Sequence, residues 1–355
     1  MRAVYFERHG GPDVLRVGTR PAPSPGRDEV AVRLDAAALN HLDLWVRGGL
    51  PGLTPPLPHV CGSDGTGIVC ELGPGAAQIL DAEGTEGVAE GERVVINPGL
   101  SCRACRSCRA GEHSLCRAFR LVGEHADGTF AERVIVPAWN VHPAPAHLAP
   151  AEAAALTLAH VTAWRMLVTR GRLRAGETVL VKGIGGGVAL AALQLAVGLG
   201  ATVVVSSRDP TKLARARALG AADGIDAGEP LPKRARELTE GRGFDVVVDS
   251  IGGDGWTDSL GALARGGRLV TCGATAGARP QTQIQRIFWN QLEVIGSTMG
   301  SDADLAQMLA FVARTKLVPV VDRIYPLEEA PAAYARLEAG AQLGKIVLAI
   351  DQEGA

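Results

Sequence analysis

The sequence lacks the features that mark membrane-spanning, exported and nucleic-acid-binding proteins. It has no run of about 18 consecutive apolar residues, so we expect no membrane helix. Its first residues are too few and too charged for a signal peptide. Lysine and arginine (36) do not exceed aspartate and glutamate (38), whereas a nucleic-acid-binding surface has a strong basic excess. We therefore expect a cytoplasmic protein that acts on a small-molecule substrate, without membrane or nucleic-acid partners.

Aromatic residues are also scarce, at 4%, whereas glycine is abundant, with 45 residues. The many glycines predict many turns and close backbone approaches. The overall composition, 46% hydrophobic and 21% charged, is ordinary for a globular protein. A length of 355 residues predicts two domains, each able to bury a core.

The first part of the chain has the patterns of short β-strands. Between residues 30 and 34, valine and leucine alternate with other residues, as in a strand with one buried face. Residues 94–96 and 134–136 are apolar runs between glycine- and proline-rich breaks. Residues 82–91, rich in glycine and glutamate, predict a solvated loop, and the alanine- and leucine-rich residues 151–167 favour a helix.

From about residue 178, the pattern changes to strands that alternate with helices. Asp209 is a suitable N-cap for one of these helices, with Pro210 at its first position and Gly220 at its end. Continuously apolar strands between helices predict a parallel sheet that is covered on both faces. The expected strands are residues 178–181, 202–205, 246–248 and 268–270, and the expected helices include residues 188–199 and 256–264.

A glycine-rich segment lies between the first of these strands and the helix that follows, which is the context that a dinucleotide-binding turn requires. Glycines allow a tight turn and let backbone N–H groups approach a pyrophosphate, and the helix N-terminus supplies partial positive charge. A plain strand–helix turn is the alternative. The predicted cofactor-binding residues of this turn are Gly183, Gly185, Gly186, Gly187 and Val188.

The end of the next strand predicts which cofactor binds. NAD sites usually place an acidic residue there, to hold the ribose 2′-hydroxyl. This chain has Ser207 and Arg208 instead, and no acid until Asp209. Ser207 can donate to a 2′-phosphate and Arg208 can pair with it, so we predict NADPH rather than NADH. The alternative for Arg208 is a solvated side chain at a helix entry.

Four of the seven cysteines lie close together, as Cys102-x2-Cys105-x2-Cys108-x7-Cys116. In a large chain without an export signal, such a cluster favours metal binding over disulfides. Four thiolates around Zn²⁺ make a closed tetrahedral site. An iron–sulfur run would have a final gap of three residues and a following proline. We therefore predict one structural zinc, with no open coordination position for chemistry.

Together these motifs resemble the medium-chain dehydrogenase/reductase superfamily, which includes zinc alcohol dehydrogenases and quinone oxidoreductases. The order of the cysteine cluster and the glycine-rich turn carries the resemblance. Further matching segments are residues 40–43 (Asn-His-Leu-Asp), 62–69 (Gly-Ser-Asp-Gly-Thr-Gly-Ile-Val), 127–132 (Asp-Gly-Thr-Phe-Ala-Glu) and 162–164 (Thr-Ala-Trp).

The resemblance implies an α/β protein with a GroES-like β-barrel catalytic domain and a Rossmann domain, whose doubly wound parallel sheet binds NADP(H). The implied boundaries are residues 1–160 and 297–355 for the catalytic domain, with a zinc lobe at 97–120, and residues 161–296 for the Rossmann domain. Family members are usually dimers or tetramers, so we expect a homodimer or homotetramer.

The sequence departs from zinc alcohol dehydrogenases where those enzymes hold their catalytic zinc. Their ligands are a cysteine, a histidine and a second cysteine, and this chain has Asn40, Ser63 and Leu158 at the matching positions. These three side chains cannot hold Zn²⁺ in an open three-ligand site. We therefore expect no standard catalytic zinc. The pattern of Asn40 and Asp43 is closer to that of the zinc-free quinone reductases, although those usually lack the cysteine cluster.

A metal site rebuilt from other residues is an alternative. By resemblance, His41, His59, Cys61 and Asp64 fall near one cleft. His59 and Cys61 occupy alternate positions and can share one face of a strand. Such residues are more often packed or hydrogen-bonded, and Cys61 can simply belong to the core.

Without a catalytic metal, hydride transfer requires a bound cofactor, an oriented acceptor and a proton source. The candidate catalytic residues are Asn40, His41, Asp43 and Thr162. The resemblance places Thr162 near the nicotinamide, and Asn40 and Asp43 can fix the cofactor or the substrate. His41 can polarise or protonate a carbonyl-type oxygen, contact a cofactor phosphate, or be a structural histidine. Two further cofactor contacts implied by the resemblance, near the adenosine ribose and the pyrophosphate, are Lys212 and Lys345.

Three functions follow from this reading. The first is an NADPH-dependent reductase of quinones, enones or other electron-poor carbonyl-type acceptors. The second is a zinc-type alcohol dehydrogenase or carbonyl reductase. The third, from another class, is a non-catalytic NADPH-binding sensor or structural protein. We favour the first because the ligands of the catalytic zinc are absent from the sequence.

Overall fold

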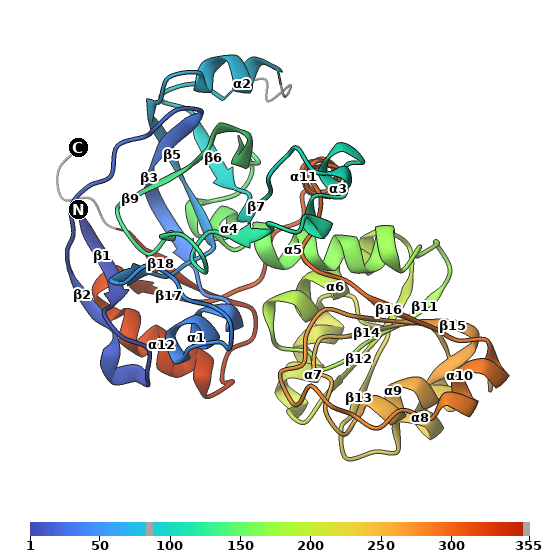
Figure 1. Cartoon of the computed structure of the whole chain (residues 1–355). Coiled ribbons are helices and arrows are strands. Elements are labelled where there is room, and N and C mark those ends of the chain that lie inside the picture. Colours follow the sequence, from blue (N-terminus) through green and yellow to red (C-terminus); the bar gives the residue numbers. More distant parts are fainter. Residues whose placement is uncertain (83–87, 351–355) are drawn as a thin grey trace. The chain divides into compact units, whose positions relative to one another are not determined.

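The computed structural model describes residues 1–82 and 88–350 and divides into two compact units (Figure 1). Unit 1 comprises residues 1–158 and the chain from residue 309 onward, and unit 2 comprises residues 159–308. The domain boundaries implied by the resemblance stay a prediction. Most of the predicted loop at 82–91 lies outside the described residues.

Unit 1 is built on a seven-stranded sheet, in which the order β10-β6-β5-β3-β18-β17 is extended by β9 pairing with β3. All its pairs are antiparallel except the β17–β18 pair. The strands predicted at 30–34, 94–96 and 134–136 are confirmed as β3, β6 and β9. The strands of unit 1 are β1 (Arg2–Phe6), β2 (Arg16–Thr19), β3 (Glu29–Ala38), β4 (His59–Val60), β5 (Asp64–Leu72), β6 (Arg93–Ile96), β7 (Gly99–Leu100), β8 (Arg120–Leu121), β9 (Arg133–Pro137), β10 (Val141–Pro143), β17 (Val321–Pro326) and β18 (Lys345–Ala349).

Short helices and two small sheets, β2-β1-β4 and β7-β8, complete unit 1. Its core gathers alternate residues of the strands around the fully buried rings of Phe6, Phe130 and Tyr334. The rings of Phe130 and Tyr334 meet edge to face, with centroids 6.1 Å apart. The helices are α1 (His41–Gly48), α2 (Ala76–Ala82), α3 (Arg106–Arg109), α4 (Pro150–Ala154) and α12 (Ala330–Glu338), with single turns η1 (Pro12–Val14), η2 (His113–Leu115), η3 (Ala138–Asn140) and η5 (Leu327–Glu329).

Unit 2 contains a six-stranded sheet with the order β13-β12-β11-β14-β15-β16, and its strands are parallel, as predicted (Figure 1). Successive strands progress outward from β11 in one direction to β13, and then from β14 in the other direction to β16. The strands are β11 (Thr178–Val181), β12 (Thr202–Ser207), β13 (Asp223–Asp226), β14 (Phe244–Asp249), β15 (Leu263–Thr271) and β16 (Glu293–Gly296), and the helices are α6 (Gly187–Gly198), α7 (Pro210–Ala218), α8 (Leu231–Leu238), α9 (Trp256–Gly261) and α10 (Ile284–Asn290).

Both faces of this sheet are buried, which explains its continuously apolar strands. Leu180 and Val247 point to one face and join a core cluster that includes Trp256 and Leu260 of α9. The neighbouring residues of β11 are also fully buried, on the opposite face. The helix predicted to begin at Pro210 is confirmed as α7, since the Asp209 carboxylate accepts a hydrogen bond from the Thr211 N–H at 2.8 Å.

Two predicted helices have different bounds in the structure. Residues 151–167 form α4 and α5 (Thr157–Trp164), followed by a π-helical segment, η4 (Arg165–Arg170), rather than one helix. The break has a physical cause, because Asp64 accepts hydrogen bonds from the Thr157 hydroxyl and the Leu158 N–H and so caps α5. Helix α9 ends at Gly261 and not at 264, because Leu263 already pairs with Phe244 as the start of β15.

A further helix, α11 (Asp302–Thr315), precedes β17 in the sequence. Over the described part of the chain, no helix combines the length and the apolar character needed to cross a membrane. The cytoplasmic location stays a prediction.

Candidate functional site

The glycine-rich turn lies at the carboxyl end of β11, next to the point where the strand order reverses between β11 and β14. Ligands of open parallel sheets bind at this edge. Gly183 and Gly185 have positive φ angles of 69° and 140°. A side chain on Gly183 would come within 2.1 Å of Ile251, whereas Gly186 has open space where a Cβ would be. The turn therefore requires glycine and leaves an accessible backbone at the N-terminus of α6, which begins at Gly187.

A lysine completes the surroundings of this turn. The ammonium of Lys212, on α7, lies 3.1 Å from where a Cβ of Gly185 would be. The structure thus brings a cation, the glycine backbone and a helix N-terminus together, and such groups favour a pyrophosphate. Val188 is the second residue of α6. These features fit the phosphates of a dinucleotide.

The end of β12 carries hydroxyl groups where NAD sites usually carry an acid. The Ser206 hydroxyl accepts a hydrogen bond from the Gly183 N–H at 3.3 Å, and the Ser207 hydroxyl accepts one from the Asp209 N–H at 3.0 Å. Arg208 is exposed. On the neighbouring strand β13, an acidic residue, Asp226, pairs in register with Ser207. The Asp226 carboxylate accepts a hydrogen bond from the Gly228 N–H at 2.8 Å.

A cluster of charged and polar side chains around Lys182, the residue directly before the glycine-rich turn, was missed by the sequence analysis. The Lys182 ammonium donates to the Asp249 carboxylate at 3.1 Å, and to the Ser259 hydroxyl and the Gly255 carbonyl at 2.8 Å each. Asp249 is fully buried at the end of β14. The signal for this cluster was a lysine directly before the glycines and an aspartate ending an apolar strand.

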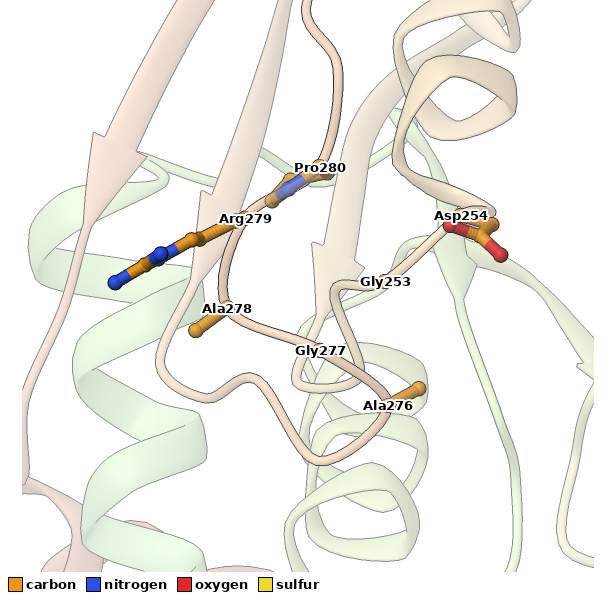
Figure 2. A pocket seen from close by; sticks show the side chains of 7 residues that line it. All are labelled: Gly253, Asp254, Ala276, Gly277, Ala278, Arg279 and Pro280. Carbon is orange, nitrogen blue, oxygen red and sulfur yellow. The ribbon is translucent and has the colours of Figure 1, made fainter.

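An open pocket lies between the loops that follow β14 and β15 (Figure 2). The two loops are joined by a bridge between Gly252 and Gly277. Figure 2 shows the side chains of Asp254 and Arg279 on opposite sides of the Gly253–Gly277 backbone crossing. The pocket lies at the same carboxyl edge of the sheet as the glycine-rich turn. We therefore treat it as part of the candidate cofactor site and not as a separate site.

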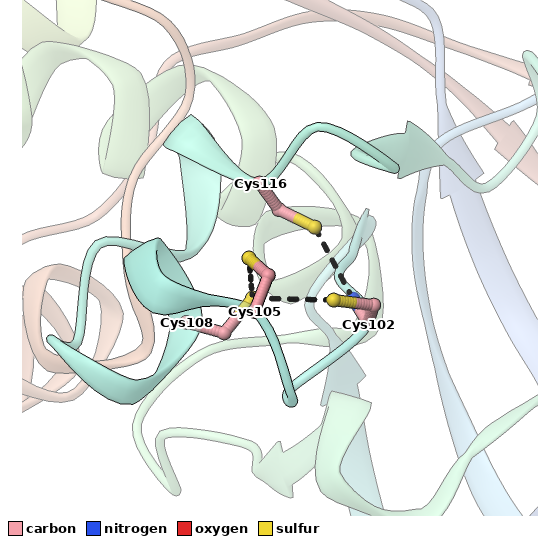
Figure 3. Close-up of side chains that lie close together, drawn as sticks. All are labelled: Cys102, Cys105, Cys108 and Cys116. Carbon is pink, nitrogen blue, oxygen red and sulfur yellow. Dashed lines mark hydrogen bonds between the residues drawn. The ribbon is translucent and has the colours of Figure 1, made fainter.

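The four clustered cysteines converge on one point in unit 1 (Figure 3). Their four Sγ atoms all lie within 4.8 Å of one another, although they come from the segments around α3 and η2. The Cys108 N–H is the largest of the effects that lower the pKa of the Cys105 thiol to about 6, which favours the thiolate that binds zinc. Four convergent thiol groups fit a tetrahedral Zn²⁺.

Two of the predicted catalytic residues, Asn40 and Asp43, are structural in their contacts. Asn40 is the N-cap of α1, and its N–H donates to the Asp43 carboxylate at 2.7 Å in a capping box. Asp43 also accepts a hydrogen bond from the Gly62 N–H at 3.2 Å. Burial raises the pKa of the Asp43 carboxyl to about 7, even though both N–H groups and Lys345 act to lower it. Their catalytic roles stay predictions.

The other two candidates differ in exposure. His41, the first residue of α1, is exposed, and its ring meets the Trp45 ring edge to face at 5.0 Å. Partial burial lowers the pKa of the His41 imidazole, so it is neutral at pH 7. Thr162, in α5, is buried, and its hydroxyl lies 3.6 Å from the Met299 sulfur.

Lys345 lies at the start of β18 and is only 4% exposed. Its ammonium donates to the Asn40 side chain at 2.5 Å and to the Asp64 carboxylate at 2.8 Å. The predicted role of Lys345 near the cofactor is thus untested, while its contacts inside unit 1 are explicit. The sequence analysis considered Asp64 only as an alternative metal ligand.

The residues of the alternative metal site are held apart by other partners. The His59 Nε2 donates to the Gly123 carbonyl at 3.0 Å, and its Nδ1 lies 3.6 Å from Asp127. Cys61 is buried, and this burial raises the pKa of its thiol. Within residues 1–82 and 88–350, the four cysteines form the one group of three or more histidine, cysteine or acidic residues that can hold a metal ion.

Comparison with known proteins connects these features to one family. Residues 26–146 match the model of the alcohol dehydrogenase GroES-like domain, and residues 187–314 match the model of zinc-binding dehydrogenases. A zinc-type alcohol dehydrogenase-like protein, YogA, of Leptosphaeria maculans is 34% identical over 98% of this chain and 96% of its own length. An NAD-dependent alcohol dehydrogenase of Sulfolobus acidocaldarius is 29% identical over 99% of this chain and its full length.

Solved structures of alcohol dehydrogenases are also similar to this chain. A crystal structure of an NAD-dependent alcohol dehydrogenase superposes with a TM-score of 0.92 at 45% identity, covering 99% of this chain and 100% of that one. A thermostable alcohol dehydrogenase from Pyrobaculum aerophilum gives a TM-score of 0.86 at 32% identity, with 99% of both chains covered. The predicted fold, a GroES-like domain with a Rossmann domain, is confirmed.

We expect the cysteine cluster to account for the structural zinc. Elemental analysis of protein purified without chelator should find a zinc content that falls by about one atom per chain in Cys105→Ser, because three thiolates and a hydroxyl do not make the same closed site. The matched control is Cys70→Ser, which removes an exposed thiol outside the cluster and should leave the zinc content unchanged. Equal zinc in Cys105→Ser and the wild type would refute the assignment.

Proposed function

We propose, for a chain that belongs to the zinc-type, medium-chain alcohol dehydrogenase family, reversible hydride transfer between NAD(P) and a small alcohol or carbonyl compound. The observation that carries this proposal is the glycine-rich turn at the reversal point of the parallel sheet, with Lys212 above it. Relatives named as NAD-dependent alcohol dehydrogenases support it.

This proposal corrects the order of functions expected from the sequence. A quinone or enone reductase ranked first there, yet the relatives are alcohol dehydrogenases by name and give it no support. The second reading, an alcohol dehydrogenase or carbonyl reductase, is therefore favoured. The third reading, a non-catalytic NADPH-binding protein, is weakened by the same relatives, which are named as enzymes.

In this proposal, the residues of the chain have the following roles. NAD(P)H would supply the hydride when bound. The N–H groups at the N-terminus of α6 and the Lys212 ammonium would hold the phosphates of the cofactor, and the exposed His41 would exchange a proton with the substrate oxygen. Because partial burial lowers the pKa of His41, its neutral form prevails at pH 7, where it can donate or accept one hydrogen bond.

A variant of His41 tests this assignment. We expect His41→Gln to lower kcat for aldehyde reduction by roughly 10²-fold, because a general acid or base typically contributes 10²–10⁴-fold and glutamine cannot transfer a proton. Cofactor affinity, measured by quenching of protein fluorescence, should not change. His147→Gln is the matched control, since its ring lies against the Leu317 carbonyl outside the proposed site.

The same assay decides the substrate class. NAD(P)H oxidation is followed with a panel of aldehydes, ketones, quinones and enones, and NAD(P)⁺ reduction with alcohols. Turnover of aldehydes or alcohols supports the proposal, and turnover of quinones or enones alone would contradict it. Full activity of His41→Gln with aldehydes would remove His41 from the mechanism and leave the substrate class intact.

We also propose that the chain prefers NADPH. Ser207 and the exposed Arg208 at the end of β12 support this choice, because the carboxylate of Asp209 is engaged in capping α7. Relatives named NAD-dependent argue in the other direction, and Asp226 is the acid through which NADH would be recognised here. The preference therefore depends on Arg208.

Replacing Arg208 measures its contribution. One charge-assisted hydrogen bond is worth about 1.5–3 kcal/mol, or about 10–150-fold in affinity. Arg208→Ala should lower kcat/KM for NADPH by about that factor and leave kcat/KM for NADH almost unchanged. The control is Arg215→Ala, which removes an exposed arginine on α7. An unchanged ratio of the two cofactors in Arg208→Ala would rule out NADPH selection by this residue.

A homodimer or homotetramer is our proposal for the assembly. β16 is the last strand of its sheet, so one of its edges has no strand partner within the described residues. Its Val294 and the side chains of Ile284, Phe288 and Trp289 on α10 are exposed, Trp289 by 70%. Two copies of such an edge can pair about a twofold axis and cover these apolar groups.

Charge at this surface should disrupt the assembly. We expect Trp289→Glu to reduce the mass measured by sedimentation equilibrium by half or to the monomer, because a carboxylate would be buried between the copies. Leu115→Glu places the same charge on an exposed apolar residue of the zinc lobe, 62% exposed against 70% for Trp289, and should leave the mass unchanged. A monomeric wild type would contradict the proposal at once.

A further inference from the structure

Lys182 connects the glycine-rich turn to the loop that follows β14. It is the first residue after β11, and its side chain is 12% exposed. Its ammonium lies 3.1 Å from the Asp249 carboxylate and 2.8 Å from the Gly255 carbonyl, so it donates to both ends of the segment between them. Asp249 is fully buried and forms an ion pair with this ammonium. The contact therefore fixes residues 249–255 relative to the start of the turn.

The segment is shaped to receive the ammonium. One oxygen of the Asp249 carboxylate accepts a hydrogen bond from the Ile251 N–H at 2.8 Å, and the other faces Lys182. A Cβ on Gly255 would lie 2.9 Å from the Lys182 ammonium, so glycine leaves the space that the ammonium needs. Ile251 lies directly against the turn, where it fills the space of a side chain on Gly183. The loop after β14 and the turn are thus held together by packing and by hydrogen bonds.

The loop that follows β15 is joined to the same segment. The Gly253 N–H donates to the Gly277 carbonyl at 3.0 Å. The Ala276 N–H donates to the Ile251 carbonyl at 2.9 Å. Figure 2 shows this crossing of the two backbones beside the open pocket. Both loops that border the pocket are therefore connected to the glycine-rich turn through Lys182.

These loops lie on one side of the glycine-rich turn, and the residues proposed to select the cofactor lie on the other. The order of strands at this edge is β12-β11-β14-β15. Ser207 and Arg208 lie at the end of β12, the turn follows β11, and the pocket loops follow β14 and β15. A dinucleotide binds across the point where the strand order reverses. If its adenosine ribose lies at β12 and its phosphates at the turn, its nicotinamide half extends toward the loops held by Lys182.

We propose that Lys182 is a positioning residue for the nicotinamide half of the cofactor, because its ammonium holds the loops after β14 and β15 and does not bind phosphate. A lysine ammonium has three N–H donors. Asp249, Gly255 and Ser259 accept all three, so none is left for a phosphate. The inference rests on the proposed function, since it requires that the chain binds a nicotinamide dinucleotide.

The test compares a whole dinucleotide with its adenosine half. Lys182→Met removes the ammonium, and the matched control, Lys233→Met, removes an exposed lysine on α8 of the same unit. Isothermal titration calorimetry of the full-length proteins gives the dissociation constants of NADPH, NADH and ADP. ADP carries the adenosine and two phosphates but lacks the nicotinamide half, so it reports the part of the site that Lys182 does not hold.

We expect Lys182→Met to raise the dissociation constant of the dinucleotide that the wild type binds by about 10-fold or more, which is about 1.4 kcal/mol. The dissociation constant of ADP should stay almost unchanged, and Lys233→Met should bind both ligands as the wild type does. An equal loss for ADP and the dinucleotide would overturn the proposal, because Lys182 would then act on the phosphates or on the whole site. Unchanged dinucleotide affinity in Lys182→Met would overturn it as well. A wild type that binds ADP but neither dinucleotide would refute the proposed function, and this inference with it.

A second variant applies if Lys182→Met does not fold, because that change leaves the Asp249 carboxylate buried without its partner. Gly255→Ala keeps both charges. Gly255 has a φ of −72°, which alanine adopts freely, but the added Cβ would crowd the Lys182 ammonium. We expect the same selective loss of dinucleotide affinity, of smaller size. The control is Gly48→Ala at the exposed end of α1, where a Cβ meets no other atom within 4 Å, and equal dinucleotide affinity in the two alanine variants would contradict the proposal.

Discussion

The pairing of Lys345 with Asp64 is the interaction on which the organisation of unit 1 most depends. A buried ammonium and a buried carboxylate are each costly alone, so they restrict the backbone to arrangements in which both are satisfied. The pair connects two strands of the central sheet, because Lys345 begins β18 and Asp64 begins β5. It also contacts the first residues of two helices, through Asn40 before α1 and Thr157 in α5. The start of α1, and with it the position of His41, is therefore linked to this charge pair through Asn40.

Unit 2 obeys a different constraint, which is the geometry of its backbone at one edge of the sheet. Gly183 and Gly185 take conformations that other residues rarely adopt, and Ile251 fills the space that a side chain on Gly183 would need. Lys182 ties Asp249 to Ser259 behind the same edge. The polar residues near the turn thus hold the loops in place, and the open space beside Gly186 leaves the N-terminus of α6 accessible to phosphates.

The sequence was sufficient for those parts of the structure that local patterns determine. The apolar strands from β11 to β15, the capped start of α7 and the spacing of four cysteines each depend on residues close in the chain. The break between α4 and α5 could not be read in this way, because the residue that caps α5 is Asp64, more than ninety positions earlier. The contacts of Lys345 were missed for the same reason, since its partners Asn40 and Asp64 are distant in sequence, and the family resemblance implied only a contact with the cofactor.

Family membership and site chemistry are separate conclusions in this protein. The family is shown by similarity in sequence and in fold that extends over almost the whole chain. The chemistry depends on a few side chains, and Asn40, Ser63 and Leu158 occupy the positions where the resemblance implies the ligands of a catalytic zinc. A chain that had only lost its ligands would bury Asp64 beside uncharged residues at a high cost in free energy. Lys345 offsets part of that cost by pairing with Asp64, so the charge of this region is balanced within the chain.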